Sequence, residues 1–203
     1  KAAHTLAAEA LALLPEETAK VRGLVLYARA ISYFQEGKLD EASDTFMLSR
    51  VELRKGGNLG GCAAALGQAG DLLVVQGKLR AALGLYKEAI SLAAGDTPHG
   101  FSSACLSFSG LGEVYYEWND LQTAFENLKR GLLLGEQMGI SEQVSAGVSL
   151  ANAHIGLHEL EQAAAILDES QFYQSIQIRQ LHAESRLFAS RMRLYTASGN
   201  HYE

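Results

Sequence analysis

The residues of this chain that could do chemistry include two acidic side chains spaced four apart, Glu113 and Glu117. On a helix they would share one face, where paired carboxylates can serve as general acid and general base. The pair also fits an ordinary solvated helix face, which we favour over catalysis. A third alternative is a binding surface on which both carboxylates hydrogen-bond a ligand.

A second pair with chemical potential is His154 and His158, also four residues apart. This spacing can present two metal ligands from one helix face. No third ligand lies nearby in the sequence, so we interpret both histidines as structural and expect no metal site.

Neither the cysteines nor the glycines complete a catalytic motif. Cys62 and Cys105 have no matched histidine, and their 43-residue separation places them on the first helices of adjacent repeats, too far apart for a disulfide. Gly77-Lys78 lacks the earlier Gly and the following Ser or Thr of a phosphate-binding loop. We therefore expect a chain that is not an enzyme and carries no cofactor of its own.

The elements that must position these residues are set by a repeat. Short turns recur with spacings of 40, 42, 39 and 41 residues, beginning at Gly37, Gly77, Asn119, His158 and Gly199. A nearly constant period of this length indicates stacked helix pairs, because one pair cannot bury its apolar face alone. Gly or Asn at the turn favours the left-handed backbone that ends a helix.

Positions around the turns repeat as well. At the first four turns, the residues seven before and five after are small, and the ninth after is large. The small residues are Ala30, Gly70, Gly112 and Ala151 before the turn, and Ala42, Ala82, Ala124 and Ala163 after it. The large residues are Phe46, Tyr86, Leu128 and Leu167. We expect small residues where the helices of a pair cross and large ones packed beside them.

This pattern resembles the tetratricopeptide repeat (TPR), although the period is longer than the usual ~34 residues. The resemblance implies an all-α, right-handed superhelix of about ten antiparallel helices, forming a single array over the whole chain. The repeats are expected at 1–16 (a half repeat), 17–57, 58–97, 98–140, 141–172 and 173–203 (incomplete). The expected helices are Ala2–Leu14, Glu17–Glu36, Asp40–Lys55, Leu59–Gln76, Arg80–Ala94, His99–Trp118, Leu121–Met138, Glu142–Leu157, Leu160–Glu169 and Tyr173–Ala197.

In TPR arrays the first helix of each pair lines the concave, ligand-facing wall. Carried over position by position, the resemblance predicts a wall of aromatic, acidic, amide and basic side chains, suited to a polar small molecule or a short peptide. The predicted wall residues are Tyr27, Ile31, Phe34, Asp71, Glu113, Tyr116, Glu117, Asn152, Arg186 and Arg193. The alternative for each is packing between repeats.

A narrower resemblance rests on the segment Leu111–Leu121, with its Tyr-Glu-Trp-Asn-Asp-Leu turn, and on Ala8–Pro15. Both are similar to the superhelical segment of MalT-like, LuxR-type transcription regulators. The resemblance implies an N-terminal domain that binds ATP and a C-terminal helix-turn-helix that binds DNA, both outside this chain. We accordingly expect a segment of a longer protein, contacting its other domains and an effector, and possible self-association.

Composition agrees with an internal, helical interaction domain. The chain has 203 residues, 48% hydrophobic content and a formal net charge of −6, without a basic patch for nucleic acid. No apolar run is long enough to span a membrane, and no signal peptide is visible. We expect a cytoplasmic, effector-sensing domain of a bacterial transcription activator; the alternative is a free-standing TPR adaptor that binds a partner's peptide.

Overall fold

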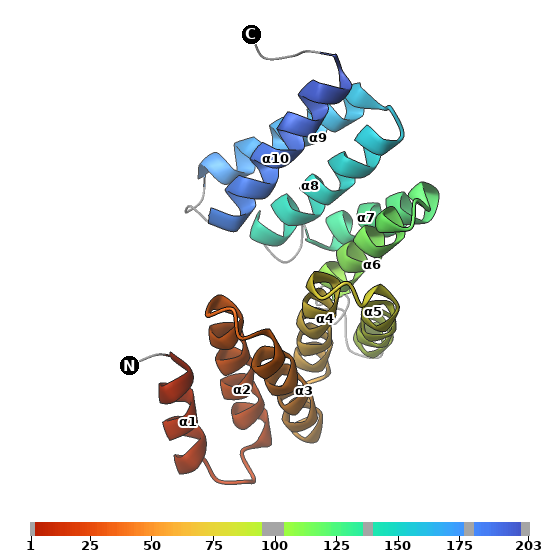
Figure 1. Cartoon of the computed structure of the whole chain (residues 1–203). Coiled ribbons are helices and arrows are strands. Elements are labelled where there is room, and N and C mark those ends of the chain that lie inside the picture. The colour runs from red at the N-terminus through yellow and green to blue at the C-terminus, as the bar shows by residue number, and fades with distance from the viewer. Residues whose placement is uncertain (1–2, 95–103, 136–139, 177–180, 200–203) are drawn as a thin grey trace. The chain divides into compact units, whose positions relative to one another are not determined.

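The computed structural model describes residues 3–94, 104–135, 140–176 and 181–199, and all regular structure in these ranges is α-helical. Ten helices follow one another in this part of the chain (Figure 1). They are α1 (Ala3–Leu13), α2 (Ala19–Gln35), α3 (Leu39–Lys55), α4 (Leu59–Val75), α5 (Leu79–Ala94), α6 (Cys105–Glu117), α7 (Leu121–Gly135), α8 (Ile140–Gly156), α9 (Leu160–Ile176) and α10 (Leu181–Ala197).

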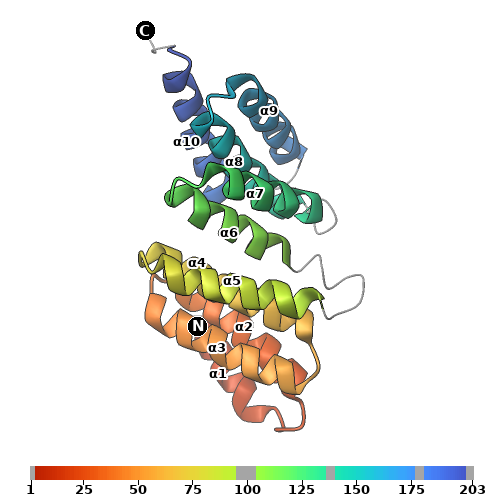
Figure 2. The same cartoon turned by 90° about the vertical axis from the view of Figure 1, so that its right-hand side faces the viewer.

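The chain divides into two compact units, residues 1–107 and 108–203, and the division falls within α6. In the first unit α2 packs on α3 and α4 packs on α5, and the ribbons of each pair overlap in the view of Figure 2. In the second unit α8 contacts α7, α9 and α10. The predicted all-α helical-repeat fold is confirmed for the described residues.

The turns have the predicted backbone. Gly37, Gly77, Asn119, His158 and Gly199 all adopt positive φ, between 56° and 73°. In the first four turns, the amide after this residue donates to the carbonyl five residues earlier, as Lys38 N does to Tyr33 O at 2.9 Å. This Schellman-type bond satisfies carbonyls that the end of a helix leaves free.

Small residues lie at the crossings, as predicted. Ala30, Ala42, Ala82, Ala124, Ala151 and Ala163 are all 0% exposed. A side chain added to Gly70 would start 2.6 Å from Tyr86 Cε1, and one added to Gly112 would start 2.4 Å from Leu128 Cγ. The residue seven before a turn therefore faces the residue nine after it. The two helices approach closely because the residue seven before the turn is small.

Helix ends differ from the prediction mainly near the C-terminus. The predicted end of a helix at Glu169 is wrong, because α9 continues to Ile176, and α10 begins at Leu181 rather than Tyr173. No Gly or Pro stands near residue 169 to stop the helix. The predicted helix ends at His99 and Met138 lie outside the described residues.

Candidate functional site

The predicted wall of the first unit is mostly occupied by packing. Tyr27 and Ile31 of α2 lie against a buried core of Ala30, Phe46 and neighbouring residues. The rings of Tyr27 and Phe46 meet edge to face at 5.3 Å between centroids. Phe34 is 40% exposed. Of these three predicted wall residues, Tyr27 and Ile31 are partly buried and Phe34 is exposed.

Asp71, on α4, has an internal partner. The hydroxyl of Tyr86, on α5, donates to Asp71 Oδ1 at 2.6 Å. Tyr86 is 1% exposed, and a buried phenol without an acceptor would be destabilising. Asp71 therefore supports the α4–α5 pair, a contribution that the sequence argument did not identify.

The second unit brings several predicted wall residues together across α6 and α8. Ser149 Oγ, on α8, donates to Glu113 Oε1, on α6, at 2.6 Å. Three residues along α6, the ring of Tyr116 lies against Gly156 of α8, whose missing Cβ would lie 3.3 Å from Tyr116 Cε2. These two contacts define a line along which α6 and α8 meet; we call it the α6–α8 seam.

Asn152 lies on this seam between the two contacts. It is three residues after Ser149 and four before Gly156, so all three share one face of α8. Its Oδ1 is buried and has no hydrogen-bond partner among the described residues. A buried carbonyl oxygen without a donor is costly, typically about 1–3 kcal/mol, so this atom would gain from a ligand's donor.

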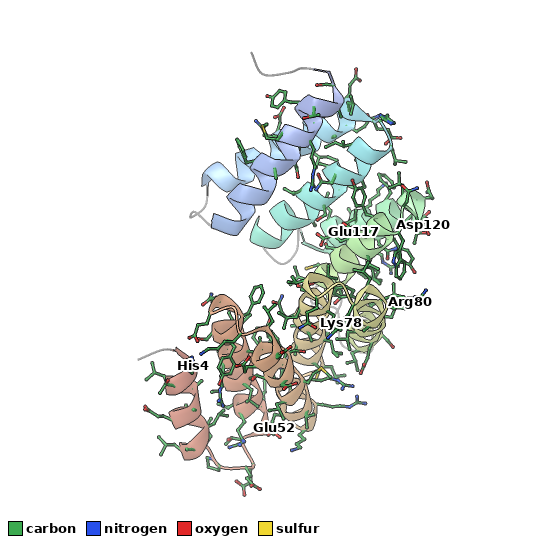
Figure 3. All side chains as sticks on the ribbon, in the orientation of Figure 1. His4, Glu52, Lys78, Arg80, Glu117 and Asp120 are labelled. Atoms are coloured by element: carbon green, nitrogen blue, oxygen red, sulfur yellow. The ribbon has the colours of Figure 1, made fainter. Side chains whose placement is uncertain are left out.

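The remaining predicted wall residues are peripheral or undescribed. Glu117 is exposed at the C-terminal end of α6, as Figure 3 shows. Arg193 is exposed on α10. Arg186 belongs to α10, but its side chain lies outside the described part of the chain. Tyr116, in contrast, packs partly buried against the core around Leu128 and Leu150.

Ser149 was not among the predicted wall residues. Equivalent positions of successive repeats pair Glu113 with Asn152, since both lie six residues before their turns. In the structure Glu113 instead reaches the residue one helical turn earlier on α8. A repeat alignment gives positions within a pair but not the axial offset between neighbouring pairs, so no sequence signal marks this bond.

The charge of the second unit favours donor-rich or cationic ligands. Residues 108–203 contain six Lys and Arg against twelve Asp and Glu, whereas residues 1–107 contain eleven of each. The whole net charge of −6 therefore belongs to the unit that carries the seam. An acidic surrounding raises the local concentration of cations and orients donors toward acceptors.

The two histidines have separate structural surroundings. His154 Nδ1 lies 2.7 Å from Glu159 Oε2, and its ring meets Phe125 of α7 edge to face. His158 is the exposed turn residue with φ +60°. The ring of His154 thus contacts α7 of the preceding helix pair, and its Nδ1 contacts the turn of its own pair. No cluster of three or more potential metal ligands occurs among the described residues.

A second polar cluster, missed from the sequence, ties α1 to α2. His4 stacks on Tyr33 at 5.1 Å, and its Nδ1 lies 2.9 Å from Glu36 Oε1. Lys38 Nζ donates to Glu36 Oε2 at 2.7 Å; this bond lowers the pKa of Glu36 and raises the pKa of Lys38. All four residues make contacts within the chain, so we assign the cluster to helix packing rather than ligand binding.

Cys62 and Cys105 are both buried, and no disulfide joins them. Burial raises the pKa of the Cys62 thiol, and its Sγ donates to the carbonyl of Arg50 at 3.4 Å. A neutral, enclosed thiol is a poor nucleophile. Within the described ranges, no helix has the length and apolarity to cross a membrane.

Antiparallel helix pairs with small crossing residues and left-handed turns define a TPR-like helical-repeat protein. The chain belongs to the family described as the MalT-like TPR region, whose model matches residues 1–202. A search of curated proteins finds no match to this chain.

Solved structures share the fold. BtubC (BKLC) from P. vanneervenii has a TM-score of 0.62 at 16% identity, over 80% of this chain and 69% of that one. A putative kinesin light chain from Podosopora anserina with nearly identical TPR-like repeats has a TM-score of 0.61 at 20% identity, covering 89% and 88%. The apo form of RapI has a TM-score of 0.68 at 11% identity, covering 91% and 50%. At these identities the likeness concerns the fold alone.

Proposed function

We propose that this chain is the effector-sensing and protein-interaction domain of a bacterial, cytoplasmic transcription activator of the MalT type. Family membership and a helical-repeat fold suited to protein interaction support this proposal. In it, other domains of the same protein bind ATP and DNA, and this domain performs no catalysis. The free-standing adaptor is the competing function.

The observation that carries the sensing function is the unpaired Asn152 Oδ1 in the α6–α8 seam. An acceptor is ready there, Ser149 and Glu113 lie one helical turn away, and the Tyr116 ring closes the other side. This arrangement suits a polar ligand that offers an N–H or O–H donor and a face for the aromatic ring.

A ligand in the seam would contact α6 and α8 together, and so would favour one arrangement of the two helices. It can shift the protein between states only by binding one of them more tightly. Because α6 and α8 belong to successive helix pairs, their relative position is a property that a bound ligand can set and other domains can read.

Thermal-shift screening against sugars, amines, amino acids and short peptides tests this function. A ligand present at 100 times its Kd adds about 2.7 kcal/mol to the free energy of unfolding. We expect Asn152→Ala to abolish the shift while leaving the ligand-free Tm equal or higher, because the variant removes a buried acceptor that has no partner.

Asn127→Ala is the matched control, since Asn127 lies on α7 and its Nδ2 donates to Thr123 O of the same helix at 2.7 Å. It should retain the shift. A ligand that stabilises Asn152→Ala as strongly as the unaltered chain would show that the seam is not the site. No shift with any small molecule, together with a shift from peptides, would favour the adaptor.

A further inference from the structure

A hollow on the second helix of the first full pair lies away from the first-helix wall. Its volume is about 310 Å³, and it is lined by Arg50, Val51, Arg54 and Lys55 of α3. The buried face of α3 is formed by other residues, Ala42, Thr45, Phe46, Ser49 and Leu53. The hollow therefore opens on a different side of α3 from this buried face.

Positive charge exceeds negative charge around this hollow. Arg50 pairs with Glu88 of α5, and Lys55 Nζ lies 2.5 Å from Glu52 Oε1. Arg54 is exposed and has no ion-pair partner among the described residues. Arg50 Nε is buried and, within the described ranges, lacks an acceptor. Within the described part of the chain, Arg54 thus has no paired anion, and the Nε–H of Arg50 has no acceptor.

An exposed apolar strip leads into the hollow. Leu48 and Val51 are 57% and 46% exposed and lie three residues apart on one face of α3. A single exposed apolar residue needs no explanation, but adjacent ones that border cationic side chains match an amphipathic partner. The partial negative charge at the C-terminus of α3 opposes an anion, but it is about half an elementary charge, and the full positive charge of Arg54 outweighs it.

We propose that this strip and hollow are a docking site for an acidic segment of a partner protein. A carboxylate of the segment would pair with Arg54 inside the hollow, and an apolar side chain would cover Leu48 and Val51. The site is separate from the α6–α8 seam, so the domain would receive a protein on one unit and an effector on the other. Burying the aliphatic stems of the cationic side chains would add to the apolar contact.

The test measures fluorescence anisotropy with a labelled helical peptide that carries Leu and Glu on one face. We expect binding that weakens with salt, and at least a tenfold loss of affinity in both Arg54→Glu and Val51→Asp. Arg80→Glu is the matched control: it makes the same charge change in the same unit, but at the start of α5, as Figure 3 shows. It should bind normally. Circular dichroism melting checks that the exposed-site variants remain folded.

Several results would overturn the proposal. Equal weakening by Arg54→Glu and Arg80→Glu would mean bulk charge attraction, and failure of the peptide to bind would remove the docking site. If free glutarate displaced the labelled peptide and bound as tightly as the peptide does, Leu48 and Val51 would contribute nothing to the affinity. Self-association in sedimentation velocity that Arg54→Glu abolishes would assign the strip to a second copy of the chain. Loss of binding in Asn152→Ala would merge this site with the effector site.

Discussion

At the scale of single residues, the fold depends on where a side chain is absent. Position seven before the turn accepts Ala at Ala30 and Ala151 but is Gly at Gly70 and Gly112. At Gly112 even one methyl group would meet Leu128 Cγ at 2.4 Å and the carbonyl oxygen of Ala124 at 3.0 Å. The Ala124 contact is with backbone, which cannot yield by a change of rotamer.

We therefore expect Gly112→Ala to lower the free energy of unfolding by about 1–3 kcal/mol, as overpacking of a close crossing does. Gly84→Ala is the matched control, because no atom lies within 4 Å of the added Cβ and the site is an exposed helix position. It should be stabilising by up to about 1 kcal/mol. Urea denaturation of both variants measures the difference; equal effects would show that the crossing tolerates the methyl group.

At the scale of the helix pair, the turn has the same backbone structure in successive repeats. Four turns make the same hydrogen bond from the residue after the left-handed position, although that position is Gly37, Gly77, Asn119 or His158. Gly adopts this backbone freely, Asn tolerates it, and His has a Cβ that crowds the carbonyl. The fourth turn is therefore built at a local cost that the packing of α8 on α9 offsets.

Substituting His158→Gly should relieve this strain. We expect stabilisation of roughly 0.5–1 kcal/mol, because the left-handed penalty of about 1–2 kcal/mol is partly cancelled by the greater freedom of Gly in the unfolded chain. The exposed His158 ring loses no packing. Asn119→Gly should change Tm less. A lower Tm for His158→Gly, measured by calorimetry, would mean that the imidazole itself supports the turn.

The helix pairs also show how far sequence reasoning reaches. Turn residues and small crossing positions predicted α2 to α5 within two residues at each end, because each signal acts within one pair. The C-terminal end of α9 was wrong, since no breaking residue marks it. The Glu113–Ser149 bond and the unpaired Asn152 depend on the offset between pairs, and the hollow beside Arg54 depends on rotamers; no local pattern encodes either.

At the scale of the whole chain, two compact units divide within α6. In helical repeats, stability is approximately a sum of each repeat and its contacts with neighbours, so damage at one crossing spreads mainly to adjacent helices. The two units also differ in charge, with all of the net −6 in residues 108–203.

Hydrogen–deuterium exchange of Gly112→Ala should therefore show graded protection. We expect faster amide exchange in α6, α7 and α8 and little change in α2 and α3, which lie in the other unit. Gly84→Ala provides the comparison in the first unit. Uniform acceleration along every helix would indicate that the chain unfolds as one cooperative body.

The bare backbone of Gly156 under the Tyr116 ring has a mechanical consequence. Interlocked side chains hinder two packed helices from sliding past each other. A flat ring that lies on a glycine does not interlock, so it allows successive helix pairs to shift at this contact. The Glu113–Ser149 hydrogen bond, two turns away on α8, then fixes the point about which α6 and α8 can rotate relative to each other. A ligand held by Asn152 would lie between these two contacts and would restrict the movement of α6 relative to α8. Binding would therefore make this junction between helix pairs stiffer.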